Sequence, residues 1–290
     1  MATALRNKTG ILFALITACG LGAITTQAKL FYADGGNALT LMLARFVAST
    51  LVFGLILLLR RETFRVSREH QLPLALLGLV WSGAMICYLL AVETISVSLA
   101  VLILYFYPLL VLGYSVLRGY LKASFALMAL FVGAFFGLYL ALSGGEVSLS
   151  LGGVLFAVLA SCGAAFTFVC GARVASRMSP LLVTFWVNGA GLILILPMMI
   201  GELKPPGTPD GLIALGLATA FYLVAILSQF QALARLPAAR AAFLLNLEPV
   251  VSILLASLVL SESLTLIQAS GVVLVIGVVL LSLRFKPAEA

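Results

Sequence analysis

Charged residues are scarce in this sequence, and their scarcity excludes a soluble domain. Only 9% of the 290 residues are Asp, Glu, Lys or Arg, whereas 63% are hydrophobic. Soluble domains carry about 25% charged residues and are about half apolar. A buried core cannot absorb so large an apolar excess, so the composition predicts an integral membrane protein with no separate soluble domain.

The chain also lacks the motifs of common membrane enzymes and pumps. It contains no H-E-x-x-H and no G-x-S-x-G. It has no P-loop either, so ATP-driven transport by this chain alone is excluded. The one histidine, His70, lies among arginines in a polar connection, and the four cysteines form no C-x-x-C. We therefore expect no catalytic centre, no metal and no other cofactor.

What the sequence does have is ten long apolar runs. A helix needs roughly 20 mostly apolar residues to span a bilayer. Barrel strands would instead alternate over about ten residues, which these continuous runs do not do. The runs are Thr9–Phe31, Asn37–Leu59, Gln71–Val92, Val97–Leu117, Ala123–Leu142, Leu151–Val174, Pro180–Ile200, Gly211–Ala234, Ala241–Leu260 and Thr265–Leu283. They predict an all-α polytopic membrane protein of ten transmembrane helices.

The basic residues fall into alternate connections and thereby predict an orientation. Of the 17 Lys and Arg residues, only Lys29, Arg45 and Lys204 lie outside the N-terminus, the even-numbered connections and the C-terminal tail. Cytoplasmic loops are enriched in Lys and Arg. We therefore expect both termini to be cytoplasmic in a bacterial-type inner membrane. The positive charge reflects this topology rather than a nucleic-acid-binding face.

Two prolines at matching positions indicate an internal repeat. Pro108 and Pro249 each lie near the middle of the fourth apolar run of their half, in AVLILYFYPLLVLGYSVL and AAFLLNLEPVVSILLASL. Because five is odd, two halves of five spans, residues 1–145 and 146–290, would have opposite orientations. Inverted repeats of this kind are found in many secondary transporters. Arg6 before the first run suggests a signal peptide, but the repeat needs that run, so we expect it to be kept.

Each proline predicts an interrupted helix. Proline lacks an N–H and clashes with the carbonyl four residues before it, so the carbonyls of Leu104 and Leu245 are expected to lose their helical partners. In a membrane such a carbonyl needs a neighbouring helix, water or a ligand. A simple kink would explain one such proline, whereas two at matching positions favour a substrate pathway.

Polar-capable side chains precede both prolines. Tyr105 and Tyr107 come before the first, and Asn246 and Glu248 come before the second. At about 100° per residue, the two members of each pair point to nearly opposite faces of a regular helix. Only one member of each pair is therefore expected to face a central cavity, and the sequence leaves open which one.

The end of the chain resembles a known family. The segment EPVVSILLASLVLSESLTLIQASGVVLVIGVVLL, residues 248–281, combines a mid-helix proline, a Ser-Glu turn and a final helix with the spaced glycines Gly271 and Gly277. This pattern resembles the EamA-type family of the drug/metabolite transporter superfamily. Tyr107 departs from the acidic or small residue common before the first proline, and this departure resembles the aromatic amino-acid exporter branch. The resemblance implies export of small metabolites by alternating access, with the fourth and ninth spans lining a central cavity.

Two charges inside the predicted spans are candidate functional groups. Arg45 lies about 12 Å below the outer surface, where a charge is costly and is usually paired or hydrated. It would snorkel, bridge helices or serve the substrate. Glu248 is the only Asp or Glu within a predicted span. It lies about 10 Å from the expected cytoplasmic end of that span. It would pair with Arg45, carry a coupling proton or sit in water at the inner mouth of the cavity.

Aromatic and amide side chains complete the predicted site. Trp81 and Tyr88 share one face of the third span, as Tyr222 and Gln229 do on the eighth, while Asn188 lies in a stripe of small and polar residues. Packing is the alternative role for each. The candidate cavity and gating residues are Arg45, Trp81, Tyr88, Tyr105, Tyr107, Pro108, Asn188, Tyr222, Gln229, Asn246, Glu248 and Pro249.

The function expected from these features is secondary export of a small metabolite, most plausibly an aromatic or other neutral amino acid. The alternatives are a different cargo, such as a cationic drug, a nucleoside or a nucleotide-sugar-like metabolite, and a membrane-embedded enzyme. Small-residue spacings such as Ala14-x3-Ala18-x3-Gly22 let helices approach closely. We expect them to act within one chain, so that the partners are the substrate and the lipid bilayer, without nucleic acid or an obligatory protein partner.

Overall fold

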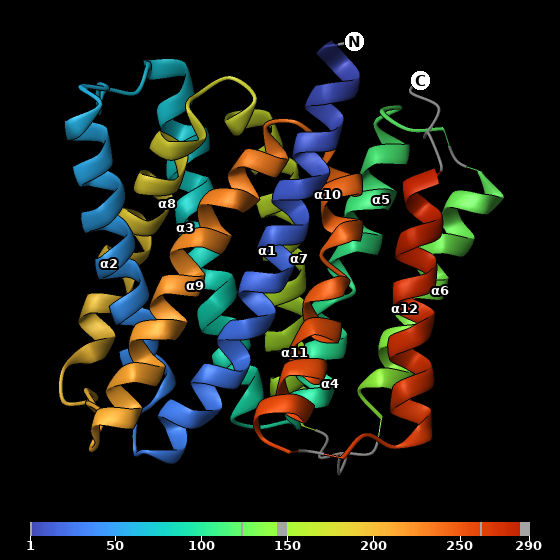
Figure 1. The fold of residues 1–290 in the computed structure, drawn as a ribbon. Helices are drawn as coiled ribbons and strands as arrows, with labels where there is room; N and C mark the ends of the chain where they lie inside the picture. Colours follow the sequence, from blue (N-terminus) through green and yellow to red (C-terminus); the bar gives the residue numbers. More distant parts are fainter. Residues whose placement is uncertain (1, 123, 144–149, 262, 285–290) are drawn as a thin grey trace.

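The computed structural model describes residues 2–122, 124–143, 150–261 and 263–284, and this part of the chain is all-helical (Figure 1). The helices are α1 (Ala2–Ala33), α2 (Ala38–Leu59), α3 (Arg68–Val92), α4 (Val97–Leu104), α5 (Tyr107–Leu117), α6 (Phe125–Ala141), α7 (Leu151–Ala175), α8 (Pro180–Ile195), the 3₁₀ helix η1 (Leu196–Met199), α9 (Pro209–Leu233), α10 (Ala238–Leu244), α11 (Leu247–Val259) and α12 (Leu266–Arg284).

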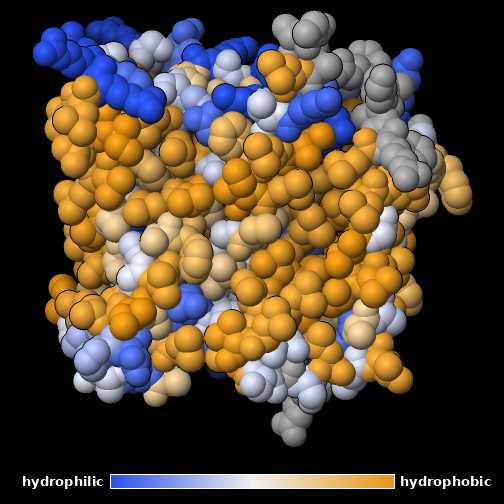
Figure 2. Space-filling view, viewed as in Figure 1, coloured by the Kyte–Doolittle hydropathy of each residue, from blue (hydrophilic) through white to orange (hydrophobic). Residues whose placement is uncertain are grey.

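The helices have the length and composition of an integral membrane protein. Within the described ranges, nine helices are long and apolar enough to cross a bilayer, with α4 and α5 counted as one span and α10 and α11 as another. Helix α6 has 17 residues and is shorter than these, and Ala123, its expected first residue, lies outside the described residues. Figure 2 shows a broad apolar band across the face in view, with hydrophilic residues gathered at the end where α1 begins. The tenth span therefore stays a prediction that depends on α6.

Polar side chains cap the starts of two helices, and a glycine turns the chain at a short connection. Asn37 accepts a hydrogen bond from Thr40 N at 2.9 Å and so caps α2. Thr208 caps α9 in the same way, by accepting from Gly211 N at 3.2 Å. Gly35 turns the chain between α1 and α2 with a φ of 91°, a conformation that glycine adopts without strain. These caps satisfy backbone groups that would otherwise be exposed at the helix ends.

The helices pack in pairs drawn from both halves of the chain. Helix α1 runs along α9 and α11, while α7 runs along α3 and the broken α4/α5 helix. Helices α2 and α8 pair at one edge of the molecule, and α6 and α12 pair at the opposite edge (Figure 1). The start of α1 and the end of α12 lie at the same end of the bundle. The expected boundary between repeats, near residue 145, falls outside the described residues.

Glycines permit the closest of these helix contacts. A Cβ on Gly22 of α1 would lie 2.7 Å from the carbonyl oxygen of Glu248 in α11. A Cβ on Gly271 of α12 would overlap backbone atoms of Gly137 and Ala141 in α6. Small residues at such crossings let backbones approach closely. The expectation that the small-residue spacings form contacts within the chain is confirmed for Gly22.

Candidate functional site

The first break in a helix separates α4 from α5 at Tyr105 and Phe106. Tyr105 N still donates to Val101 O at 2.9 Å, but Phe106 N donates only three residues back, to Ile103 O at 3.1 Å. Pro108 then lies buried in the first turn of α5. Among the described residues, no hydrogen bond reaches the carbonyl of Leu104, so this carbonyl is open, as the proline rule predicts.

The second break separates α10 from α11 at Leu245 and Asn246, and hydrogen bonds between residues of the same span satisfy its backbone. The carbonyl of Leu245 accepts a hydrogen bond from Glu248 N at 2.9 Å. The expectation that this carbonyl is freed is therefore wrong, because a 3₁₀-type turn replaces the bond that Pro249 cannot make. The buried side chain of Asn246 also donates, from Nδ2 to Phe243 O at 2.8 Å.

The two tyrosines of the first break do not point to opposite faces. Their ring centroids are 5.8 Å apart, and both side chains are buried. The expectation assumed a regular helix of 100° per residue, which places residues two apart about 160° from each other, whereas a 3₁₀-like turn of about 120° per residue places them about 120° apart and allows the two rings to meet. Tyr107 also stacks on Phe168 of α7 with a centroid separation of 4.9 Å.

Glu248 lies deeper than expected. The predicted ninth span began at Ala241, but the helix begins at Ala238, because Arg240 and its neighbours belong to α10 rather than to the preceding loop. The break that carries Glu248 is therefore near the middle of the span Ala238–Val259. Tyr105 is a close electrostatic neighbour of the Glu248 carboxylate, so the two breaks come together at this pair.

A tyrosine cluster surrounds this carboxylate. Tyr88 of α3 and Tyr107 of α5 are electrostatic neighbours of Glu248, and Tyr88 is also a neighbour of Tyr105. These side chains come from three different spans. We call Tyr88, Tyr105, Tyr107 and Glu248 the tyrosine–carboxylate cluster.

Arg45 belongs to a second group, on α2. Its guanidinium carbon lies 5.3 Å from the centroid of the Tyr222 ring on α9, and its Nε donates to Leu41 O at 3.3 Å. The side chain thus links α2 to α9 and is partly exposed. Its electrostatic neighbours are Tyr222 and Tyr32, whereas that of Glu248 is Tyr105. Arg45 and Glu248 therefore have separate partners.

Buried amide and aromatic groups extend this second group. The Tyr222 hydroxyl donates to Asn188 Oδ1 at 2.9 Å, and Asn188 Nδ2 donates to Thr184 O at 2.7 Å. The indole N–H of Trp81 lies beside the Tyr222 hydroxyl but has no hydrogen-bond partner of acceptable geometry. We call Arg45, Trp81, Asn188 and Tyr222 the arginine cluster.

The structure relates the remaining predicted residues to these clusters as follows. Tyr32, at the end of α1, is an electrostatic neighbour of both Arg45 and Tyr88, and it is 40% exposed. Gln229 is buried on α9, and its Oε1 has no hydrogen-bond partner. Pro249 is buried in the first turn of α11. Sequence reasoning missed Tyr32, because a tyrosine at the end of a span usually anchors the helix at the membrane surface.

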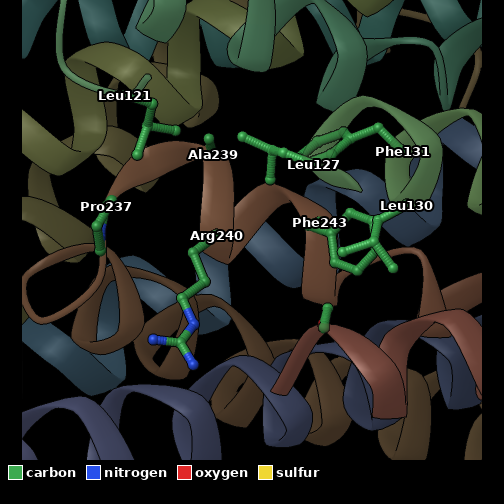
Figure 3. A pocket seen from close by; sticks show the side chains of 9 residues that line it. Leu121, Leu127, Leu130, Phe131, Pro237, Ala239, Arg240 and Phe243 are labelled. Atoms are coloured by element: carbon green, nitrogen blue, oxygen red, sulfur yellow. The ribbon is translucent and has the colours of Figure 1, made fainter. Parts of the chain in front are cut away.

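Two hollows in the structure lie apart from these clusters. A cavity of about 40 Å³ near the start of α10 is lined mainly by apolar side chains. Figure 3 shows Leu127 and Phe131 of α6 gathered near Phe243, with Arg240 set apart from them. A groove of about 310 Å³ runs beside the first break, where Phe106 and Cys162 line it. Neither hollow is lined by any of the twelve predicted residues.

Comparisons with known proteins agree with this architecture. The EamA-like transporter family matches residues 8–143 and 151–284. A relative from Archaeoglobus fulgidus, named only as an uncharacterized transporter, is 29% identical over 200 residues, which cover 68% of this chain and 71% of the relative. A solved crystal structure of 19% identity covers 93% of this chain and 99% of its own with a TM-score of 0.78. At that identity the solved structure shows the fold alone.

The family match and the named relative indicate a polytopic membrane transporter rather than an enzyme. The matched residues take up nearly the whole sequence, and the chain belongs to the EamA-like transporter family.

Proposed function

We propose that this protein is a secondary exporter of neutral amino acids, with a preference for aromatic ones, and that it works by alternating access. The observation that carries the proposal is the contact between the two broken helices, where Tyr105 of the first break is a close electrostatic neighbour of Glu248 in the second. Interrupted helices near the bilayer midplane form the substrate sites of many secondary transporters.

The chemistry around this contact supports the substrate class. A carboxylate can bind the ammonium group of an amino acid, and the rings of Tyr88, Tyr105 and Tyr107 offer an aromatic surface to its side chain. Phe168 extends that surface by stacking on Tyr107. The open carbonyl of Leu104 adds a hydrogen-bond acceptor.

The helix pairing supports an inverted repeat. If the two halves are exchanged, α1 corresponds to α7 and α9 to α3, so the α1–α9 pair corresponds to the α7–α3 pair. The two family matches divide the chain in the same place. Rocking of one repeat against the other would then open the cluster to each side in turn. We also propose that the protein lies in an inner membrane, and that the start of α1 and the end of α12, which lie near the basic loops, face the cytoplasm.

Counterflow in liposomes tests the substrate. Purified protein would be reconstituted with internal unlabelled solute, and uptake of labelled phenylalanine would be compared with that of threonine, uridine and a quaternary amine. We expect phenylalanine to exchange fastest. Exchange of the quaternary amine alone would instead support the alternative function, export of cationic drugs, which the cluster of one carboxylate and three tyrosines also fits.

An imposed pH gradient tests the role of Glu248. Glu248→Gln keeps the shape of the side chain but removes its charge, so we expect it to abolish the response of phenylalanine flux to the gradient. Glu93→Gln removes an exposed carboxylate at the end of α3 and is the matched control. An unchanged rate and pH profile in Glu248→Gln would contradict a coupling role.

A further inference from the structure

The arginine cluster has more hydrogen-bond donors than partners. A guanidinium has five N–H donors, and the one hydrogen bond of Arg45 runs from Nε to Leu41 O on its own helix. Over the ranges that the structure describes, no carboxylate lies within ion-pair distance of Arg45. Its cationic group instead faces the ring of Tyr222, an arrangement that leaves its terminal N–H groups without an anionic acceptor.

Neighbouring side chains also have hydrogen-bond donors without partners. The indole N–H of Trp81 is buried without a partner beside Tyr222, and Trp81 itself is 8% exposed. Ser49, one helical turn after Arg45, has a buried hydroxyl that also lacks a partner. Buried polar groups are almost always hydrogen-bonded. A cation and two unpartnered donors on α2 and α3 therefore call for an anion.

The position of the cluster separates it from the carboxylate site. Arg45 lies in the second turn of α2, whereas Glu248 lies at the second helix break. Trp81 and Tyr88 belong to the two different clusters, and their separation along α3 is about 10 Å at 1.5 Å per residue. Arg45 and Glu248 thus belong to separate clusters with different electrostatic neighbours.

We infer that the arginine cluster is a carboxylate-binding site, with Arg45 as its charged group and Trp81 as a second donor. A single guanidinium matches a monoanionic carboxylate, which it binds through two parallel N–H···O bonds. This inference deepens the proposed function, on which it rests for the source of the carboxylate: an amino acid in transit rather than a free organic acid.

Binding to the arginine cluster can be measured directly, because the chain has only two tryptophans. In a Trp186→Phe background, the fluorescence of Trp81 reports on the cluster. The probes are 3-phenylpropionate, which has a carboxylate and no ammonium group, and phenethylamine, which has an ammonium group and no carboxylate. Arg45→Gln should raise the half-saturating concentration of 3-phenylpropionate about tenfold or more, while phenethylamine binding stays the same.

Two further variants control for folding and for overall charge. Arg45→Lys keeps the charge but loses the planar fork, so its affinity for 3-phenylpropionate should fall between those of the parent and Arg45→Gln. Arg65→Gln removes an exposed positive charge from the α2–α3 connection and should bind like the parent. Equal binding of 3-phenylpropionate by the parent and Arg45→Gln would overturn the inference, as would complete competition by chloride at equal concentration.

Counterflow separates this inference from the proposed function. If Arg45→Gln exchanges phenylalanine as fast and with the same half-saturation as the parent, the carboxylate site is wrong and the exporter proposal stands. If the parent binds 3-phenylpropionate through Arg45 but does not exchange phenylalanine, the site stands and the amino-acid proposal fails. Faster exchange of 3-phenylpropionate than of phenylalanine would identify a free organic acid as the source.

Discussion

The two broken helices share a proline and differ in how their backbones are satisfied. At the first break, the carbonyl of Leu104 is open and two tyrosines form the surface. At the second break, Glu248 N–H bonds the carbonyl of Leu245, and the Asn246 side chain bonds Phe243 O. One interruption leaves an acceptor for a partner, whereas the other satisfies its backbone internally and presents a carboxylate.

This difference shows that matching prolines do not imply matching chemistry. Proline breaks both helices, but the residues just before it decide what each break offers. The breaks are complementary, because the tyrosine of one is an electrostatic neighbour of the acid of the other. Substitutions at one break are therefore expected to affect the other break.

The largest effect is expected from closing the space beside the second break. Gly22→Ala would place a Cβ 2.7 Å from the carbonyl oxygen of Glu248, a backbone atom that cannot move without displacing α11. Overpacking of this kind costs about 1–3 kcal/mol, and thermal unfolding in detergent would measure it. Gly216→Ala, where a Cβ would meet nothing within 4 Å, should be neutral or stabilising. Equal unfolding temperatures for the two variants would show that the second break is not tightly enclosed.

A smaller effect is expected from separating the two breaks. Tyr105→Phe removes the hydroxyl that neighbours Glu248, and buried polar contacts in membrane proteins contribute about 0.5–1.5 kcal/mol. Tyr107→Phe keeps the stacking on Phe168 and should cost less. The pH profile of phenylalanine exchange should also shift in Tyr105→Phe and stay unchanged in Tyr107→Phe. If the two variants behave alike, the breaks do not communicate through Tyr105.

The smallest effect is expected at a contact far from both breaks. Thr208 N, at the start of α9, donates to Asp34 Oδ2 in the α1–α2 turn at 3.0 Å. This backbone hydrogen bond is the main cause that lowers the pKa of Asp34. A lowered folded-state pKa stabilises the protein above the ordinary value of about 3.9 and loses this contribution as the pH falls through the lowered pKa.

Asp34→Asn should therefore lower the unfolding temperature slightly at pH 7 and converge with the parent in strong acid. Phenylalanine exchange and its pH profile should not change, because Asp34 lies outside both clusters. A shift of the pH profile in this variant would mean that titration at the outer surface, and not at the breaks, sets the pH dependence.

Most of the helices could be predicted from the sequence, because an apolar run of membrane-spanning length has few alternative structures. The predicted and observed ends of the second, third and fourth spans agree within a few residues. The start of α10 could not be predicted, because Pro237 and Arg240 are typical of a loop, and this error placed Glu248 too near the surface. The depth of a residue depends on where its helix begins, which is the least certain part of such a prediction.

The side-chain contacts were harder to predict than the residues involved. Periodicity shows which side chains share a face of one helix, but it does not show which helices meet. Tyr222 and Asn188 are bonded across two helices, and the contact between Arg45 and Tyr222 joins the two halves of the chain. The pairing of Tyr105 with Tyr107 depends on a local change from α to 3₁₀ geometry, which a regular-helix rule cannot anticipate.

The short helix α6 has a consequence for the surrounding lipid. Its 17 residues rise about 26 Å at 1.5 Å per residue, whereas the hydrocarbon layer of a typical bilayer is about 30 Å thick. Helix α6 packs against α12 at the edge of the molecule (Figure 1), so this mismatch faces lipid on its outer side. Where α6 forms the predicted tenth span, the bilayer must thin locally there or the flanking side chains must reach outward, and this edge is then expected to be sensitive to membrane thickness.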